Sequence, residues 1–121
     1  MDYIFDNNRP IYIQLVEGLR IKIISGKFKS GERLPSVREL ALTAKVNPNT
    51  MQKALAELEE EDLIYTERTN GKFVTDNQEL IEKLKIKLAK EKVKNFLNDM
   101  KNIGITYEEA LKYLQEIGGD N

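Results

Sequence analysis

The 121-residue sequence contains no cysteine, histidine or tryptophan and only three prolines. Without cysteine, neither a disulfide framework nor a thiolate metal site can form, and a reducing compartment fits. The lack of histidine removes the usual general base and the commonest metal ligand. Long apolar runs are missing, and the first ten residues lack the basic and hydrophobic regions of a signal peptide. We therefore expect a soluble cytoplasmic protein that is not an enzyme and has no catalytic, cofactor-binding or metal site.

Charge is distributed unevenly along the chain, although its net value is only -1. The stretch from Arg20 to Ala56 holds eight basic and two acidic residues, a local charge of +6. An acidic run follows directly and consists of Glu57, Glu59, Glu60, Glu61 and Asp62. If the basic stretch binds a polyanion, this run must point away from it.

The segment Thr43–Leu63 is the one around which the chain is organised, and it predicts the second half of a helix-turn-helix. Asn47 suits an N-cap and Pro48 the first helical position. One face of this helix is apolar and comprises Met51, Ala54, Leu55 and Leu58. The opposite face is polar at the helix start and comprises Asn49, Thr50, Gln52 and Lys53. Recognition helices meet base edges and phosphates at this end, but any solvated helix has a polar face, so the pattern alone fits both roles equally.

Two more helices are predicted before this segment. The first spans Pro10–Ser25, and its apolar stripe consists of Tyr12, Leu15, Val16, Leu19 and Ile23. The second begins after Ser36, which forms a capping box with Glu39. Arg38 then faces outward in the first turn, where it opposes the helix dipole. That placement favours a phosphate or guanine contact, with a solvated surface arginine as the alternative.

A β-hairpin is predicted after the third helix. Its strands are Ile64–Arg68 and Lys72–Thr75, and the Asn70-Gly71 pair between them favours a tight turn. Three helices followed by a hairpin make a winged helix. Arg68 and Lys72 flank the hairpin tip, either to contact phosphate or the minor groove, or to protect an edge strand by charge.

From Gln78 onward the pattern changes, so we expect a winged-helix domain over residues 1–76 and a helical tail over residues 77–121. One apolar seam of the tail has alternating spacings of three and four: Ile86, Ala89, Val93, Phe96, Met100 and Ile103. A short last helix, capped by Thr106 and Glu109, is expected to bury Leu111, Leu114 and Ile117. Such a small helical hairpin cannot bury both faces alone, which predicts a homodimer. A membrane-surface helix is the weaker alternative, because the lysines are offset by acids.

These motifs resemble those of GntR-family transcription regulators of the small YtrA-type subgroup. The resemblance covers Pro10–Ala41, Val46–Thr66 and the wing segment ending in GKFV at Gly71–Val74. Its most specific part is LPSVREL followed by VNPNT. The C-terminal helical hairpin resembles the dimerisation tail of that subgroup. The resemblance thus implies a mainly α fold with a small β-hairpin: a winged helix-turn-helix DNA-binding domain plus a two-helix dimerisation tail.

The resemblance also implies a function, namely a homodimeric repressor of a palindromic operator, often beside genes for ABC-type transporters. No small-molecule effector is expected, since the tail has no room for a ligand-binding fold. The expected DNA-binding residues are Ser36, Arg38, Asn47, Asn49, Thr50, Gln52, Lys53, Arg68, Asn70, Gly71 and Lys72. The expected dimer interface consists of Ile86, Ala89, Val93, Phe96, Met100, Ile103, Leu111 and Leu114. In the wing, Thr69-Asn70-Gly71 replaces the usual Gly-basic-Gly tip.

A winged-helix adaptor that binds other proteins is the second function considered, and the acidic run and near-neutral net charge favour it. Retention on a heparin column that is lost with added salt distinguishes a DNA-binding protein from such an adaptor. An enzyme ranks third, because Glu60 and Glu61 are adjacent on a helix and do not face each other.

The lack of histidine and cysteine predicts that DNA affinity is nearly independent of pH between about 6 and 8, because no side-chain type present ordinarily titrates there. The dissociation constant for a DNA duplex, measured by fluorescence anisotropy across this range, checks the prediction. A change of about tenfold in the dissociation constant, which corresponds to about 1.4 kcal/mol of binding free energy, would contradict it.

Overall fold

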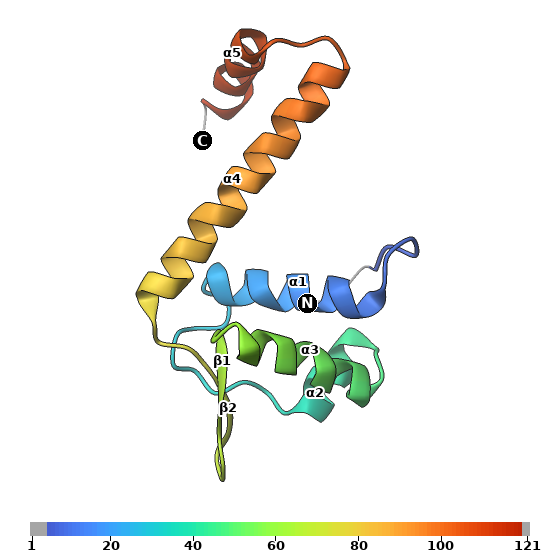
Figure 1. Ribbon diagram of the computed structural model, residues 1–121, viewed down its shortest axis with the longest axis vertical. Helices are drawn as coiled ribbons and strands as arrows, with labels where there is room; N and C mark the ends of the chain where they lie inside the picture. Colours follow the sequence, from blue (N-terminus) through green and yellow to red (C-terminus); the bar gives the residue numbers. More distant parts are fainter. Residues whose placement is uncertain (1–4, 120–121) are drawn as a thin grey trace. The chain divides into compact units, whose positions relative to one another are not determined.

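The computed structural model describes residues 5–119, so the outermost residues of both expected domains, 1–4 and 120–121, lie outside it. The described elements are α1 (Ile11–Ile24), α2 (Val37–Ala44), α3 (Pro48–Glu60), β1 (Ile64–Glu67), β2 (Gly71–Val74), α4 (Gln78–Asn102) and α5 (Tyr107–Gly118) (Figure 1). This order confirms the predicted mainly α fold, with a winged helix-turn-helix followed by two C-terminal helices.

The chain divides into two compact units, and the division falls after Lys83. The first unit therefore includes the start of α4. The domain boundary expected at residues 76–77 coincides with the beginning of α4 and stays a prediction.

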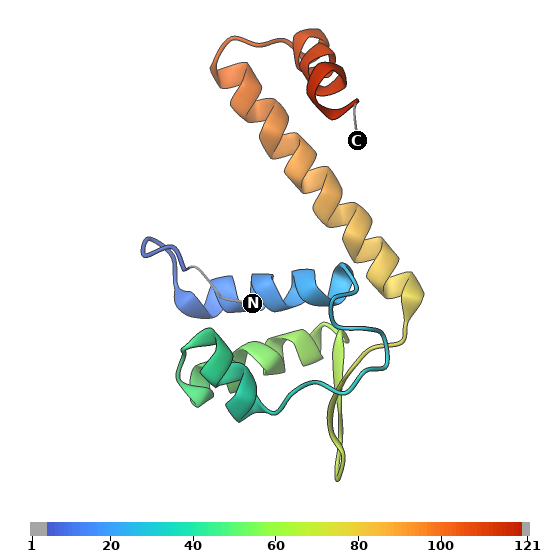
Figure 2. The same ribbon diagram turned by 180° about the vertical axis from the view of Figure 1, so that it is seen from behind.

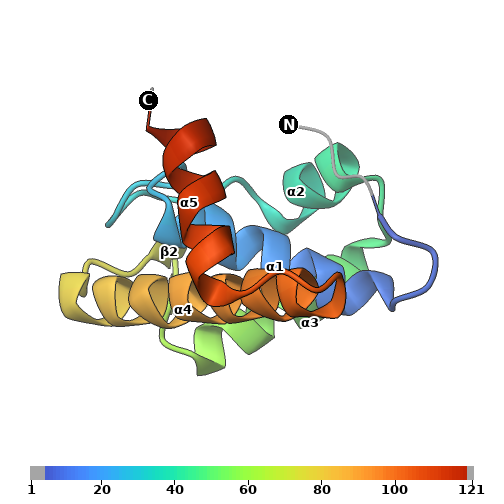
Figure 3. The same ribbon diagram turned by 90° about the horizontal axis from the view of Figure 1, so that it is seen from above.

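The core of the first unit lies where α1 and α2 pack on α3, with α1 running along α3 (Figures 1 and 3). Apolar stripes from the three helices meet there, as their spacing predicts. The buried side chains include Leu15, Val16, Leu19, Ile23, Leu40, Ala41, Met51, Ala54, Leu55 and Leu58. Each large apolar side chain that is fully buried contributes about 1.5 to 3 kcal/mol to stability. This cluster therefore supplies most of the free energy that holds the three helices together.

Both helices of the helix-turn-helix are capped as the sequence predicts. The Ser36 hydroxyl accepts a 3.1 Å hydrogen bond from the Glu39 backbone N–H, and the Glu39 carboxylate accepts one of 3.4 Å from the Ser36 backbone N–H. Asn47 caps α3, and Pro48 occupies its first position. These caps fix where α2 and α3 begin and therefore which side chains lie in their first turns.

The hairpin pairs Ile64 with Val74 at its base and Glu67 with Gly71 at its far end. The prediction that Asn70-Gly71 forms the turn is only partly correct, because Gly71 begins β2 and the turn residues are 68–70. Gly71 has φ of +97°. Glycine adopts this backbone conformation without strain, so Gly71 suits the position where the chain leaves the turn and enters β2.

The free edge of β2 pairs with the segment that precedes α2. The Leu34 backbone N–H donates to the Lys72 carbonyl at 2.8 Å, and the Val74 N–H donates to the Glu32 carbonyl at 2.9 Å. Arg33 lies opposite Phe73 in this pairing. Figure 2 shows the segment crossing the hairpin on its way to α2. The wing is thus fixed beside the start of α2, which sequence spacing alone does not predict.

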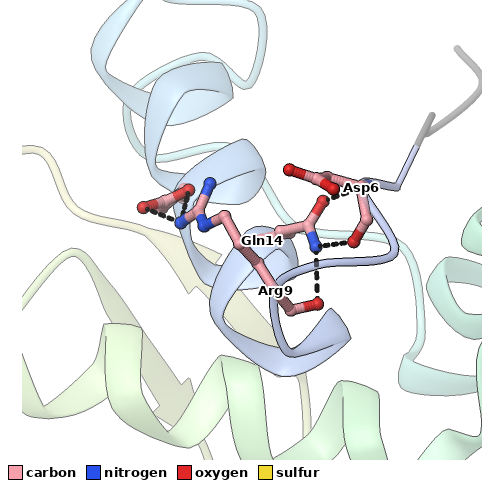
Figure 4. Close-up of polar contacts among 4 residues, drawn as sticks. Asp6, Arg9 and Gln14 are labelled. Carbon is pink, nitrogen blue, oxygen red and sulfur yellow. Dashed lines mark hydrogen bonds and ion pairs between the residues drawn. The ribbon is translucent and has the colours of Figure 1, made fainter.

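A short turn before α1 is held by one glutamine side chain (Figure 4). Gln14 Oε1 accepts a 2.6 Å hydrogen bond from the Asp6 backbone N–H, while Gln14 Nε2 donates to the carbonyls of Asp6 and Arg9 at 2.7 and 2.9 Å. Arg9 Nη2 donates to both carboxylate oxygens of Glu17 at 2.8 Å. These bonds tie the turn to α1, whose N-terminus has no side-chain cap.

The second unit consists of the rest of α4 and α5. The predicted Thr106–Glu109 capping box is present, and its hydrogen bonds lower the pKa of Glu109. The expected buried stripe of α5 is not covered by the chain itself: Leu111, Leu114 and Ile117 are 42%, 50% and 81% exposed. The cause is the small size of the unit, because two helices leave no third element to cover this face. Within residues 5–119, no helix is both long and apolar enough to span a bilayer.

Candidate nucleic-acid interface

The start of α3 presents the polar residues that the sequence predicts for DNA recognition. Asn47, Asn49, Gln52 and Lys53 are exposed, and Thr50 is half-buried. The Asn47 side chain accepts a 2.7 Å hydrogen bond from the Asn49 backbone N–H, which fixes the first turn. All five residues lie at the positive end of the helix dipole, which attracts phosphate.

Arg38 lies exposed in the first turn of α2. Within the described part of the chain it makes no side-chain hydrogen bond or ion pair, and its neighbour Glu39 is committed to the capping box with Ser36. A cation at a helix N-terminus opposes the dipole, so this position is unfavourable until an anion binds. The geometry therefore leaves Arg38 available for phosphate or a base edge.

The acidic run at the end of α3 is largely engaged within the protein. Glu57 accepts a 2.7 Å hydrogen bond from the Tyr12 hydroxyl. Glu61 accepts two from Arg20, at 2.9 and 2.6 Å. Glu59 accepts a hydrogen bond from Thr66 and pairs with a wing lysine. These contacts hold three of the acids against α1 and the wing.

This engagement weakens one of the two observations that favoured a protein-binding adaptor, namely the acidic run. A free acidic run would be a docking surface, but Glu57, Glu59 and Glu61 have partners in the first unit. Glu60 and Asp62 are the two exposed members.

Lys53 is held by an aromatic ring that sequence reasoning does not find. Its Nζ lies 4.4 Å from the centroid of the Tyr12 ring on α1. The same ring carries the hydroxyl that donates to Glu57, one turn further along α3. Tyr12 was predicted only as part of the buried stripe of α1, and it is half-buried instead. The ring thus places Lys53 at the border between the outer face of α3 and α1.

The wing residues divide into free and engaged side chains. Arg68 and Asn70 are exposed at the tip, and Asn70 Nδ2 donates to Glu67 at 3.0 Å. Lys72 donates to Thr66 Oγ1 at 3.0 Å and lies 3.7 Å from Glu59. Lys72 is therefore held against the hairpin and α3, whereas Arg68 has no hydrogen bond or ion pair from its side chain among the residues described.

The structure brings the wing and the start of α2 together. A groove of about 320 Å³ is lined by residues 33–37 on one side and by residues 66–69, 71 and 72 on the other. It contains the predicted Ser36, Arg68, Gly71 and Lys72 together with Arg33, which the sequence reasoning did not select. The hairpin projects beyond α3 on the side away from α1 (Figure 1).

The predicted interface residues of the tail lie in the second unit. Most of them are exposed, namely Ile86, Ala89, Val93, Ile103, Leu111 and Leu114, while Phe96 and Met100 are half-buried. An apolar groove of about 360 Å³ lies between α4 and α5. It is lined by Lys92, Val93, Phe96, Leu97, Tyr107, Leu111 and Leu114.

Sequence and structure both match known regulators. Residues 11–74 match the family model of bacterial regulatory proteins, gntR family. The HTH-type transcriptional repressor YtrA of Bacillus subtilis (strain 168) is 36% identical over 116 residues, which cover 94% of this chain and 88% of YtrA. A GntR family transcriptional regulator from Listeria monocytogenes has a TM-score of 0.85 and 41% identity, covering 93% of this chain and 99% of that one. AraR(DBD), in complex with operator ORX1, has a TM-score of 0.55 and 25% identity, covering 62% and 95%.

The hydrogen bond from Tyr12 to Glu57 predicts a loss of stability at alkaline pH. This bond, followed by burial and the negative charge of Glu57, raises the pKa of Tyr12 above 10.0. A group whose pKa is raised on folding stabilises the protein while protonated, so the contribution is present below pH 10 and is lost as pH rises through the folded pKa. Tyr12→Phe removes the titrating hydroxyl and keeps the ring beneath Lys53.

Urea unfolding between about pH 8 and pH 12 measures this effect. The free energy of unfolding should fall more steeply with pH in the parent than in Tyr12→Phe. Tyr65→Phe, which removes a hydroxyl from the exposed Tyr65, is the matched control and should follow the parent. Identical pH profiles for the parent and Tyr12→Phe would contradict the assignment.

Proposed function

The chain belongs to the gntR family of bacterial regulatory proteins, and we propose that it is a homodimeric repressor whose two winged-helix units bind the two halves of a palindromic operator. The family is one of transcription regulators rather than enzymes. The observation that carries the DNA-binding part of the proposal is the exposed Arg38 in the first turn of α2, which has no ion-pair or side-chain hydrogen-bond partner among residues 5–119. YtrA, which is named a repressor, supports the direction of regulation.

In this proposal, the first turns of α2 and α3 meet the major groove. Asn49 and Gln52 offer amide groups that pair with adenine, and Arg38 offers a guanidinium that pairs with guanine or phosphate. Arg68 at the wing tip contacts the adjacent backbone or minor groove. AraR(DBD), which shares the fold and was crystallised with an operator, supports this use of the winged helix.

The dimer part of the proposal is supported by the uncovered apolar surface of the second unit. Val93, Leu111 and Leu114 leave 56%, 42% and 50% of their surface exposed around the groove between α4 and α5. A soluble monomer seldom exposes a contiguous apolar surface of this kind. A second copy offers the same surface, so a twofold arrangement covers both at once. Two linked winged helices then match an inverted repeat in the DNA.

The resemblance to the YtrA-type subgroup further supports control of ABC-type transporter genes, and action on chromosomal DNA supports a cytoplasmic location.

Selection of binding sites from a library of randomised duplexes by the full chain tests the proposal as a whole. The proposal predicts enrichment of an inverted repeat whose half-sites lie about one helical turn, or a multiple of it, apart. Enrichment of a single, non-symmetric site would refute the dimeric reading. A failure to enrich any sequence would refute sequence-specific binding.

Arg38→Ala should weaken binding to a selected duplex by about 1 to 3 kcal/mol if the arginine pairs with guanine, and by less if it contacts phosphate alone. Because Arg38 is exposed and unpaired, the unfolding midpoint should hardly change. Anisotropy titrations of the parent and the variant give the difference. Lys29→Ala, which removes a charge from the loop before α2, is the control and should bind nearly as the parent does. Unaltered affinity in folded Arg38→Ala would remove this residue from the interface.

Phe96→Asp should convert the protein to a monomer at micromolar concentration. Burying a phenylalanine contributes about 1.5 to 3 kcal/mol per chain, and loss of a packed ring typically costs about 3 to 5 kcal/mol. In a symmetric dimer this loss is counted twice. The winged helix should stay folded, because its core of Leu15, Met51 and Leu55 lies in the first unit.

Sedimentation velocity separates the outcomes. The parent and Asn95→Asp, which adds the same charge at the neighbouring exposed position of α4, should sediment as dimers, and Phe96→Asp as a monomer. A dimer in all three would show that Phe96 packs within its own chain. In the monomer, tight binding to the inverted repeat should be lost, while weak salt-sensitive binding survives.

A further inference from the structure

The five arginines of the chain fall into two groups. Arg9 and Arg20 form ion pairs of 2.8 and 2.6 Å with Glu17 and Glu61. Arg33, Arg38 and Arg68 are exposed, and within residues 5–119 none of them makes a side-chain hydrogen bond or an ion pair. An arginine is always charged and carries five donors in a planar fork that matches phosphate. The three unpaired arginines all lie at the start of α2 or on the wing.

Arg33 is held in place by both its backbone and its side-chain surroundings. Its neighbours Glu32 and Leu34 hydrogen-bond to β2, at 2.9 Å from Val74 and 2.8 Å to Lys72. The Arg33 side chain extends across Gly71, because a Cβ built on Gly71 would lie 3.2 Å from Arg33 Nε and 3.5 Å from Nη2. The guanidinium therefore passes over the end of the hairpin, at a position that the missing side chain of Gly71 leaves open.

Arg33 and Arg68 line the same groove between the start of α2 and the wing. Two other charged residues line it, Lys72 and Glu67. Lys72 is paired with Glu59, and Glu67 accepts a hydrogen bond from Asn70. The two arginines have no ion-pair or hydrogen-bond partner among residues 5–119, and with Lys72 they outnumber Glu67, the single acid of the groove.

We propose that this groove binds a backbone phosphate of the DNA duplex, with Arg33 and Arg68 as its two cationic ligands. This inference rests on the proposed function, since it concerns the same duplex, and it adds Arg33 as a contact. Phosphate is the matching group because a guanidinium binds its oxygens through paired N–H donors. We assign this phosphate to the DNA duplex, because the groove lies between Ser36 and the wing tip, two places already expected to contact DNA. Arg33 thereby links the wing to α2 through the bound phosphate.

The salt dependence of DNA binding tests the proposal, because each neutralised phosphate contributes about 0.9 to the slope of log affinity against log salt. The probes are a selected duplex and a mixed-sequence duplex of equal length, titrated with the full-length parent, Arg33→Gln, Arg68→Gln and the double variant. Lys29→Gln, which removes one charge from the same connection outside the groove, is the matched control. Circular dichroism and the unfolding midpoint verify that each variant is folded.

Each single variant should bind about three- to tenfold more weakly, and equally so for both duplexes, since phosphate carries no base identity. The double variant should lose about 0.9 in slope, as expected for one shared phosphate, and its loss of affinity should be smaller than the product of the single losses. Lys29→Gln should change the slope clearly less.

Several results would overturn the inference. An Arg33→Gln variant that binds like Lys29→Gln would show that Arg33 does not contact the duplex. A loss of about 1.8 in slope in the double variant would indicate two separate phosphates. A loss confined to the selected duplex would indicate base contact instead. Calorimetry with inorganic phosphate adds a further arm: if phosphate binding is lost in Arg33→Gln while duplex binding is unchanged, the groove binds a free anion. If the parent binds neither duplex, the proposed function fails, whereas a weakened Arg38→Ala beside an unaffected Arg33→Gln refutes this inference alone.

Discussion

Three glutamates at the C-terminal end of α3 join this helix to α1 and to the wing. Glu57 and Glu61 bind Tyr12 and Arg20 of α1, while Glu59 binds the wing. Exposed ion pairs contribute little to stability, so the buried leucines and Met51 supply most of it. The buried stripe of Met51, Ala54, Leu55 and Leu58 turns one face of α3 toward the core, and the glutamates add polar contacts on its flanks. With its flanks occupied, α3 presents Asn49, Gln52 and Lys53 outward.

The same contacts explain how a chain of net charge -1 can offer a cationic surface. Two of the acids at the end of α3 have cationic partners, Glu61 with Arg20 and Glu59 with Lys72, and the hydrogen bond to Glu61 raises the pKa of Arg20. The arginines left without partners in the described residues are Arg33, Arg38 and Arg68. Net charge therefore says little about this surface, because the pairing of charges within the fold decides which of them face a ligand.

The predictable features are those whose cause is local in sequence. The capping boxes at Ser36 and Thr106 join residues three apart, and the helical stripes repeat every three or four residues, so both can be read directly. The Tyr12–Glu57 and Arg20–Glu61 contacts join residues 45 and 41 apart, and they exist only because α1 packs along α3. Arg33 escaped prediction for the same reason, since its place over Gly71 follows from pairing with β2. The spacing of Leu111, Leu114 and Ile117 correctly predicted an apolar face on α5. Spacing alone does not show whether that face is covered by the same chain or by a second one.

We propose that the starts of α2 and α3 and the wing form one surface for DNA, while the end of α3 binds α1 and the wing. Amide chemical-shift changes of the ¹⁵N-labelled chain on addition of a selected duplex test it residue by residue. The account predicts changes concentrated at residues 33–38, 47–53 and 68–72, with small changes at the exposed Ile13 and Ile21 of α1. Changes centred on α1, with residues 36–38 and 47–53 unaffected, would contradict it.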